Sequence, residues 1–174
     1  AGNATLSFDN GERVIAPLLQ RLSIKQIDYG FISHVDSDHY KGFLSLIKNG
    51  WIKEIYKPSI DTSLNKDVQL EEIIQSSNVK MHYYSKSKMM FGNLAFYILN
   101  DTTISRYNNF DSNDKSGVFK IVHGKNSFLF VGDAEYTAEN LWIKNYGKFL
   151  DSDVLKIGHH GSKSSSSKKF INIV

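Results

Sequence analysis

Short apolar segments that predict β-strands alternate with segments of helical periodicity along the whole chain, and this alternation restricts the fold more than any other feature. Strands are predicted at residues 27–33, 52–56, 79–84, 94–99, 117–122, 127–131 and 154–157. Helices are predicted at about 12–22, 40–48, 64–75 and 134–146, and Pro17 either begins or kinks the first of them. Residues 123–126 indicate a β-hairpin turn. Strands mixed with helices, including a hairpin, favour an α/β (α+β) protein with mixed sheets.

The composition limits the possible sites more than the partners. The chain has 174 residues, so we expect a single domain over residues 1–174. No cysteine occurs, which excludes disulfide scaffolds, thiolate catalysis and iron–sulfur clusters, and leaves histidine and carboxylate side chains to hold any metal ion. No segment approaches the run of about 20 apolar residues that crosses a bilayer. The formal net charge of +3 neither requires nor excludes a nucleic-acid partner.

Four potential metal ligands lie within six positions directly after the first predicted strand: His34, Asp36, Asp38 and His39. In an extended segment, residues two apart share a face, so the first three side chains can converge, and the turn into the next helix can bring His39 beside them. Imidazole and carboxylate groups suit zinc, manganese or iron. The alternative is a polar loop that caps the helix, with Asp38 or Ser37 as the cap. We favour the metal site because no Lys or Arg lies among these residues.

Two further clusters follow later strands. Asp133 follows the predicted strand 127–131, and taken alone it is more often a helix cap than a ligand. His159 and His160 follow the last predicted strand and lie between two glycines, which crowd the imidazoles little. Three clusters that each follow a strand indicate a site on a rigid scaffold. For the remaining histidines, His82 and His123, we favour a structural or solvent-exposed role.

Together these clusters resemble the pattern of the metallo-β-lactamase superfamily, whose first loop has the form His-x-His-x-Asp-His, whose later strand ends in a bridging Asp and whose final loop supplies a last His. The match is with the ComEC-type branch (DNA internalization-related competence proteins), which has His-x-Asp-x-Asp-His, Gly-Asp-Ala-Glu and Gly-His-His-Gly-Ser-Lys. Here these are residues 34–39, 132–135 and 158–163. The resemblance covers nearly the whole chain. It implies an αββα sandwich and a chain that is truncated at both ends.

The resemblance also implies roles for individual residues. Six side chains would be metal ligands: His34 and Asp36 to one ion, Asp38 and His39 to the other, Asp133 to both and His159 to the second. The residues implied in catalysis are Asp38, Asp133 and His160, and the last of these is a ligand, a phosphate contact or a proton donor. The family's middle histidine has no counterpart here, and Asn113 or Asp114 lies near its place. With Asp36 in place of a histidine, the first metal site is expected to be weak, empty or suited to a harder ion such as manganese.

The chemistry expected from such a site is hydrolysis. One or two divalent ions, zinc or manganese, would lower the pKa of a bound water for attack on carbon or phosphorus. Three carboxylates favour phosphorus, and the substrate contacts that we expect are Lys156, Ser162, Lys163, Asn113 and Ser116. The alternative for the Ser/Lys stretch 162–169, which includes Lys168 and Lys169, is a solvated tail, a mobile loop or the start of a helix.

The function that we expect is therefore a metal-dependent phosphodiesterase or nuclease. By the resemblance, its partners are single-stranded DNA and a membrane channel domain in the full-length protein, with this domain outside the cytoplasm at a bacterial inner membrane. No small-molecule cofactor is expected. One alternative is a hydrolase of another ester, amide or thioester, including a stand-alone cytoplasmic enzyme, since fold does not determine function. The other is a metal-poor, non-catalytic domain that binds DNA or a protein partner.

Overall fold

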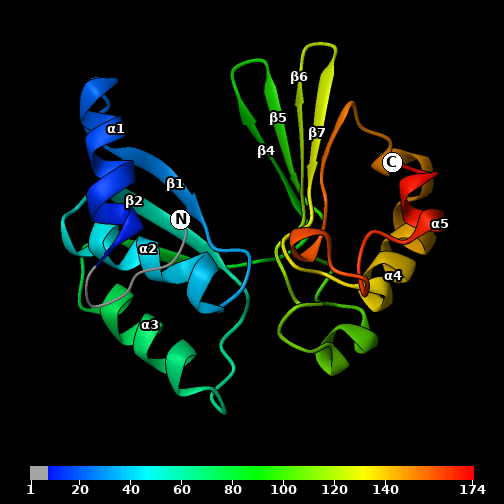
Figure 1. The fold of residues 1–174 in the computed structure, drawn as a ribbon, viewed down its shortest axis with the longest axis horizontal. Helices are drawn as coiled ribbons and strands as arrows, with labels where there is room; N and C mark the ends of the chain where they lie inside the picture. Colours follow the sequence, from blue (N-terminus) through cyan, green and yellow to red (C-terminus); the bar gives the residue numbers. More distant parts are fainter. Residues whose placement is uncertain (1–7) are drawn as a thin grey trace. The chain divides into compact units, whose positions relative to one another are not determined.

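The computed structural model describes residues 8–174, apart from the side chains of residues 106 and 108. The chain divides into two compact units, Ala1–Tyr83 and Tyr84–Val174 (Figure 1). Each unit has its own sheet and its own apolar core, and the α/β class predicted from the sequence is confirmed. The prediction of one domain over residues 1–174 stays a prediction. Within the described residues, no helix combines the length and the apolar character needed to span a membrane.

The first unit is built on a parallel sheet of three strands in the order β1-β2-β3. These are β1 (Ile27–Phe31), β2 (Ile52–Lys57) and β3 (Lys80–Tyr83). Helix α2 (Ser37–Lys48) connects β1 to β2, and α3 (Asn65–Gln75) connects β2 to β3, as parallel pairing requires. Both helices lie along the same face of the sheet (Figure 1), and their apolar side chains pack with those of the strands. Because β1 and β2 are parallel, the loops that follow them leave the sheet at the same edge.

The chain enters this unit through a helical segment that the sequence predicts as one helix. A π-helical turn, η1 (Gly11–Ile15), runs directly into the short helix α1 (Ala16–Arg21). Pro17 lies in the first turn of α1, directly after the π-helical turn. Of the two alternatives for Pro17, the structure therefore selects the beginning of the α-helix.

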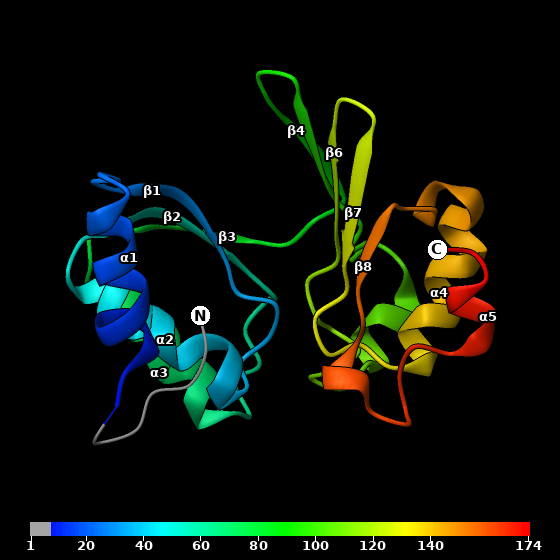
Figure 2. The ribbon, with the colours of Figure 1, turned by 45° about the horizontal axis from the view of Figure 1, so that its top comes forward.

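The second unit contains a mixed sheet of five strands in the order β4-β5-β6-β7-β8 (Figure 2). The strands are β4 (Ser87–Phe91), β5 (Leu94–Ile98), β6 (Phe119–His123), β7 (Asn126–Phe130) and β8 (Val154–Lys156). β4 to β7 are antiparallel, and β8 lies parallel to β7. The helices are α4 (Tyr136–Tyr146) and α5 (Lys168–Ile171), with 3₁₀ turns η2 (Ser105–Asn109), η3 (Gly147–Leu150) and η4 (His159–Gly161). A core that includes Leu129, Trp142 and Phe170 joins the sheet to α4 and α5.

The sequence does not predict strand β4. Its side chains are mostly exposed, so it shows neither the alternation of a half-buried strand nor the apolar run of a buried one. It forms because its backbone pairs with β5 over the full length of both strands, from Ser87↔Ile98 to Phe91↔Leu94. An edge strand of this kind depends on its neighbour rather than on its own composition.

Candidate functional site

The first predicted cluster lies between β1 and α2. The chain leaves β1 at Phe31, and Asp36 is the N-cap of α2, with extended backbone angles. The backbone oxygen of Asp36 accepts hydrogen bonds from the N–H groups of His39 at 2.8 Å and Tyr40 at 3.1 Å. Its side chain makes no capping hydrogen bond. The helix therefore begins without using this carboxylate, and the capping alternative does not account for it.

The side chains of this cluster converge around one serine. Ser33 Oγ lies 3.2 Å from Nδ1 of His34 and 3.1 Å from Nδ1 of His39, and the two rings are 4.1 Å apart. The other nitrogens face carboxylates: His34 Nε2 is 3.6 Å from Asp36 Oδ2, and His39 Nε2 is 3.4 Å from Asp38 Oδ2. The structure thus brings together all four residues that the sequence predicts here. Ser33 was missed, because a serine before a histidine carries no signal of its own.

Lys66 is a second residue of this cluster that the sequence did not reveal. It lies in the first turn of α3, and its Nζ forms an ion pair with Asp36 Oδ1. Burial by itself would raise the pKa of Asp36, but the hydrogen bond from Lys66 and the charges of Lys66, His34 and His39 outweigh burial and lower it. Asp36 is consequently held as an anion on one side by an ammonium group and on the other by imidazole.

The helix that carries Lys66 also takes part in a buried network of ion pairs. Lys57, at the end of β2, is fully buried, and its Nζ contacts Asp67 Oδ1 and Glu71 Oε1, each at 2.8 Å. Tyr83 donates its hydroxyl to the same Glu71 carboxylate, at 2.9 Å and 3.0 Å from the two oxygens. Because Asp67 and Glu71 belong to α3, this network fixes the helix that carries Lys66. No local pattern in the sequence predicts that Lys57 is buried.

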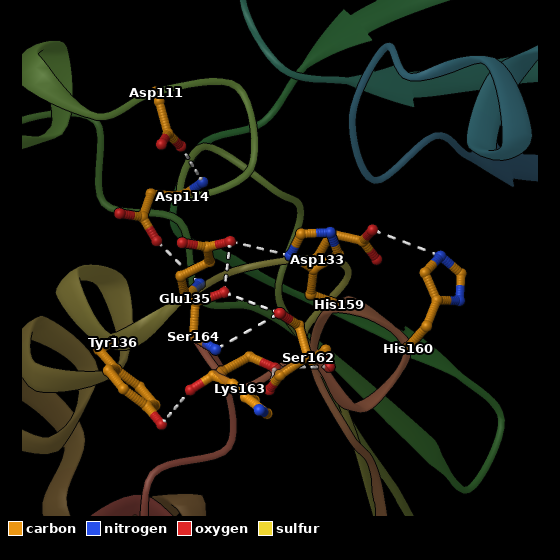
Figure 3. Close-up of polar contacts among 12 residues, drawn as sticks. Asp111, Asp114, Asp133, Glu135, Tyr136, His159, His160, Ser162, Lys163 and Ser164 are labelled. Atoms are coloured by element: carbon orange, nitrogen blue, oxygen red, sulfur yellow. Dashed lines mark hydrogen bonds and ion pairs between the residues drawn. The ribbon is translucent and has the colours of Figure 1, made fainter.

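In the second unit, Asp133 lies in the turn between β7 and α4. Its side chain is buried, and its backbone N–H donates to Ser116 Oγ at 3.0 Å. Nε2 of His160 lies 3.4 Å from Asp133 Oδ2 (Figure 3). The N-cap of α4 is Glu135 rather than Asp133. The helix-cap alternative therefore does not describe Asp133, and the structure brings it together with His160.

His159 points to a different partner. Its Nδ1 lies 2.8 Å from Glu135 Oε1, and Ser164 Oγ donates to the same carboxylate oxygen at 2.8 Å (Figure 3). Burial by itself would raise the pKa of Glu135, but hydrogen bonds from Ser164, His159 and Asn113 and the charge of His159 lower it. Both histidines have left-handed backbone angles, with φ of 41° at His159 and 51° at His160. This conformation turns the two neighbouring rings toward separate partners.

The loop that precedes β6 forms hydrogen bonds with the Gly132–Glu135 motif. Asp114 accepts a hydrogen bond from the Glu135 N–H at 2.8 Å. Burial raises the pKa of Asp114, against the hydrogen bonds from the N–H groups of Glu135 and Ala138. With Ser116 on Asp133 and Asn113 on Glu135, three neighbouring polar residues bind the motif. Asn113 and Ser116 as substrate contacts stay predictions, and both have structural partners here.

The Ser/Lys stretch folds into an ordered loop rather than a solvated tail. Ser165 is buried and donates to the Gly158 carbonyl at 2.8 Å, while Glu139 of α4 accepts the Ser167 N–H at 2.9 Å. The short helix α5 begins after Ser167, whose Oγ accepts the Phe170 N–H. The helix-start alternative is thus the one that the structure shows for residues 168–171.

The three residues predicted to contact substrate beside this loop all have partners within the unit. Lys156 Nζ lies 3.4 Å from the Gly132 carbonyl oxygen and 3.1 Å from that of Ile157. Ser162 Oγ is 3.0 Å from Ser164 Oγ. The Lys163 carbonyl accepts the Tyr136 hydroxyl at 2.5 Å. Substrate contact by these side chains stays a prediction.

The two histidines set aside in the sequence have structural partners. His82 Nε2 lies 2.7 Å from Glu54 Oε2, and its ring stacks on Tyr56 at 4.5 Å. His123 Nε2 lies 3.1 Å from Asn93 Oδ1 at the end of β6. His82 thus contacts the neighbouring strand β2, and His123 contacts the turn between β4 and β5.

Comparison with known proteins relates residues 5–174 to the model of the metallo-beta-lactamase superfamily. ComE operon protein 3 of Bacillus subtilis (strain 168) is 29% identical over 165 residues, which are 94% of this chain and 21% of that protein. Competence protein ComA of Neisseria gonorrhoeae is 30% identical over 183 residues, which are 99% of this chain and 23% of that protein. The chain thus spans about a fifth of the length of these relatives. These matches confirm the resemblance that the three motifs predict.

Among solved structures, the CmlA beta-hydroxylase E377D mutant is similar in fold. The TM-score is 0.51 at 16% sequence identity, and the match covers 75% of this chain and 26% of the other. At this identity the likeness concerns the fold alone, and it agrees with the family match.

Proposed function

The chain belongs to the metallo-beta-lactamase superfamily, and from this membership we propose that it is a metal-dependent hydrolase that cleaves phosphodiester bonds of DNA. The observation that carries the proposal is the arrangement in the first unit, where two imidazoles share Ser33 through Nδ1 and face carboxylates through Nε2. A histidine that binds metal through one nitrogen usually hydrogen-bonds a second partner through the other. The donor set therefore fits a divalent ion.

The ligands that we propose are those that the family resemblance implies. They are His34, Asp36, Asp38, His39, Asp133 and His159. One or two ions, zinc or manganese, would be bound by these imidazole and carboxylate groups. Bound ions of this kind lower the pKa of a coordinated water and neutralise charge that develops on the substrate. The Lys66 ion pair already neutralises part of the charge of Asp36, which supports the expectation that the first of the two metal sites is the weaker.

The protein's own groups would perform the remaining steps. Asp133 is buried and held through its backbone by Ser116, so its carboxylate has a defined position. We propose that Asp133 and Asp38 orient the attacking water and that His160 holds the proton for the leaving oxygen at Nε2, the atom that lies 3.4 Å from Asp133. Lys156, Ser162, Lys163, Asn113 and Ser116 remain the proposed substrate contacts.

DNA is proposed as the substrate for two reasons. A carboxylate-rich site suits hard ions and phosphoryl chemistry, and the similar proteins from Bacillus subtilis and Neisseria gonorrhoeae are named a ComE operon protein and a competence protein. We extend this to single-stranded DNA during uptake, with a membrane channel in the full-length protein and this domain outside the cytoplasm. We propose that the reaction uses no small-molecule cofactor.

The test compares substrates and one variant. The protein with manganese or zinc should hydrolyse bis(p-nitrophenyl) phosphate and single-stranded DNA faster than a β-lactam or a thioester. Loss of a residue that only hydrogen-bonds a metal ligand costs about 10–100-fold. Asp133 is itself a proposed ligand, so Asp133→Ala should lower turnover by more than about 100-fold. Asp28→Ala, at an exposed carboxylate of β1, should leave turnover unchanged and serves as the control. Preferred cleavage of the lactam or thioester, or full turnover by Asp133→Ala, would contradict the proposal.

A further inference from the structure

Glu135 ends the Gly-Asp-Ala-Glu motif, and the proposed chemistry assigns it no role. It is the N-cap of α4, but its side chain makes no capping hydrogen bond. Its backbone N–H donates to Asp114 Oδ1 at 2.8 Å. The side chain is about one quarter exposed, at 26%. A glutamate so placed is available for another contact, and Figure 3 shows its carboxylate directed at the ring of His159.

The Glu135 carboxylate is itself held firmly. Oε1 lies 2.8 Å from His159 Nδ1 and accepts the Ser164 hydroxyl at 2.8 Å, and Asn113 supplies a further side-chain hydrogen bond. Ser164 in turn is positioned by its carbonyl, which accepts the Tyr136 N–H at 3.0 Å. The carboxylate is thus held by Asn113 of the loop before β6 and by Ser164 of the Ser/Lys stretch, and α4 binds that stretch through the Tyr136 N–H.

This contact favours the tautomer of His159 that carries its proton on Nδ1. An ionised carboxylate only accepts hydrogen bonds, so the neutral imidazole donates from Nδ1 and keeps Nε2 as an acceptor. An acceptor nitrogen is what a metal ion requires. The backbone alone does not hold the ring, since His159 has a φ of 41° in the sparsely populated left-handed region, where surrounding contacts must maintain the conformation.

We propose that Glu135 is the positioning residue of His159, which fixes its tautomer and its ring orientation so that Nε2 is presented to a divalent ion. The inference rests on the proposed function, because it takes His159 as a metal ligand. It also explains the contact made by the Ser/Lys stretch, because Ser164 donates a hydrogen bond to the Glu135 carboxylate that contacts His159.

The first measurement is made on the metal-free protein. Nitrogen-15 NMR of the imidazole side chains, at a pH where they are neutral, should find His159 protonated at Nδ1 in the wild type. In Glu135→Ala the ring should relax toward the mixture of tautomers of free imidazole. Glu135→Gln keeps an acceptor oxygen of the same size and should retain part of the Nδ1–H form. An unchanged tautomer in Glu135→Ala would overturn the proposal.

The second measurement is the affinity for manganese or zinc by calorimetry. Glu135→Ala should bind about 10–100-fold more weakly than the wild type, with Glu135→Gln between them. Glu139→Gln is the matched control, because Glu139 lies one turn along α4 and holds the same loop without contacting His159. An equal loss in Glu139→Gln would show a general effect on the loop and overturn the proposal. Wild-type protein that binds no metal would overturn the proposed function as well, whereas equal tight binding by wild type and Glu135→Ala overturns this inference alone.

Discussion

At the scale of single residues, Lys57 is a fully buried charge that is compensated by neighbouring groups. Its ammonium group has two carboxylate partners and the Pro58 carbonyl oxygen at 3.0 Å. A buried charge is tolerable only with such compensation, and removal of one partner leaves the others without it. The network is therefore more sensitive to loss of its cation than any exposed ion pair of the same unit.

Lys57→Met should destabilise the protein by about 3–5 kcal/mol, because Asp67 and Glu71 would stay buried without a cation. Urea unfolding followed by circular dichroism measures this change. The control is Lys53→Met, at an exposed lysine paired with Asp28, which should leave the midpoint unchanged. Similar midpoints for Lys57→Met and the wild type would show that the network contributes little.

Tyr83 belongs to the same network and should titrate late. Partial burial, together with the hydrogen bond to Glu71 and the charges of Glu71 and Asp67, raises the pKa of Tyr83 to about 12. A raised pKa means that its contribution to stability is complete below the ordinary tyrosine value of about 10 and is lost as pH rises toward 12. Tyr83→Phe should remove one late step from the ultraviolet alkaline titration. Tyr146, which burial and Asp101 also bring to about 12, is distinguished by its own Phe variant. An unaltered late step in Tyr83→Phe would contradict the assignment.

At the scale of elements, the contact between η1 and α2 depends on one missing side chain. A Cβ added at Gly11 would lie 2.0 Å from the backbone oxygen of Gly42 and 2.4 Å from Ser45 Oγ. The backbone of η1 therefore approaches α2 as closely as only glycine allows. Since α2 carries Asp38 and His39 in its first turn, this packing bears on the orientation of two proposed ligands.

Gly11→Ala should cost about 1–3 kcal/mol, because the obstructing atom is backbone and the helices must separate. Thermal unfolding measures the loss. Gly30→Ala is the comparison, since its added Cβ would meet the Phe43 ring at 3.0 Å, and a side chain can move. A smaller loss at Gly11 than at Gly30 would contradict the close approach of η1 and α2.

At the scale of the whole molecule, metal binding should appear as stability. A ligand that binds only the folded state at about 100 times its dissociation constant adds about 2.7 kcal/mol. We expect manganese or zinc to raise the unfolding temperature, a chelator to reverse the rise, and Asp38→Ala and His159→Ala to lower both the rise and the metal content per chain. Unchanged metal content in both variants would refute the ligands that we propose.

The sequence by itself determined the features that depend on neighbouring residues. Periodicity predicted the α/β class, and the placement of His34, Asp36, Asp38 and His39 after a strand predicted that they converge, because their spacing is local. The order of three short motifs along the chain predicted the family, which the comparisons confirm.

Only the tertiary structure decided which distant residues support those motifs. Lys66 reaches Asp36 across 30 positions, and Glu135 reaches His159 across 24. Such contacts depend on which strands lie side by side, and a pattern within one segment does not contain that information. Strand β4 was missed for the same reason, since its pairing with β5, not its own composition, makes it a strand. Partners within a motif follow from local spacing, whereas partners between motifs follow from the sheet.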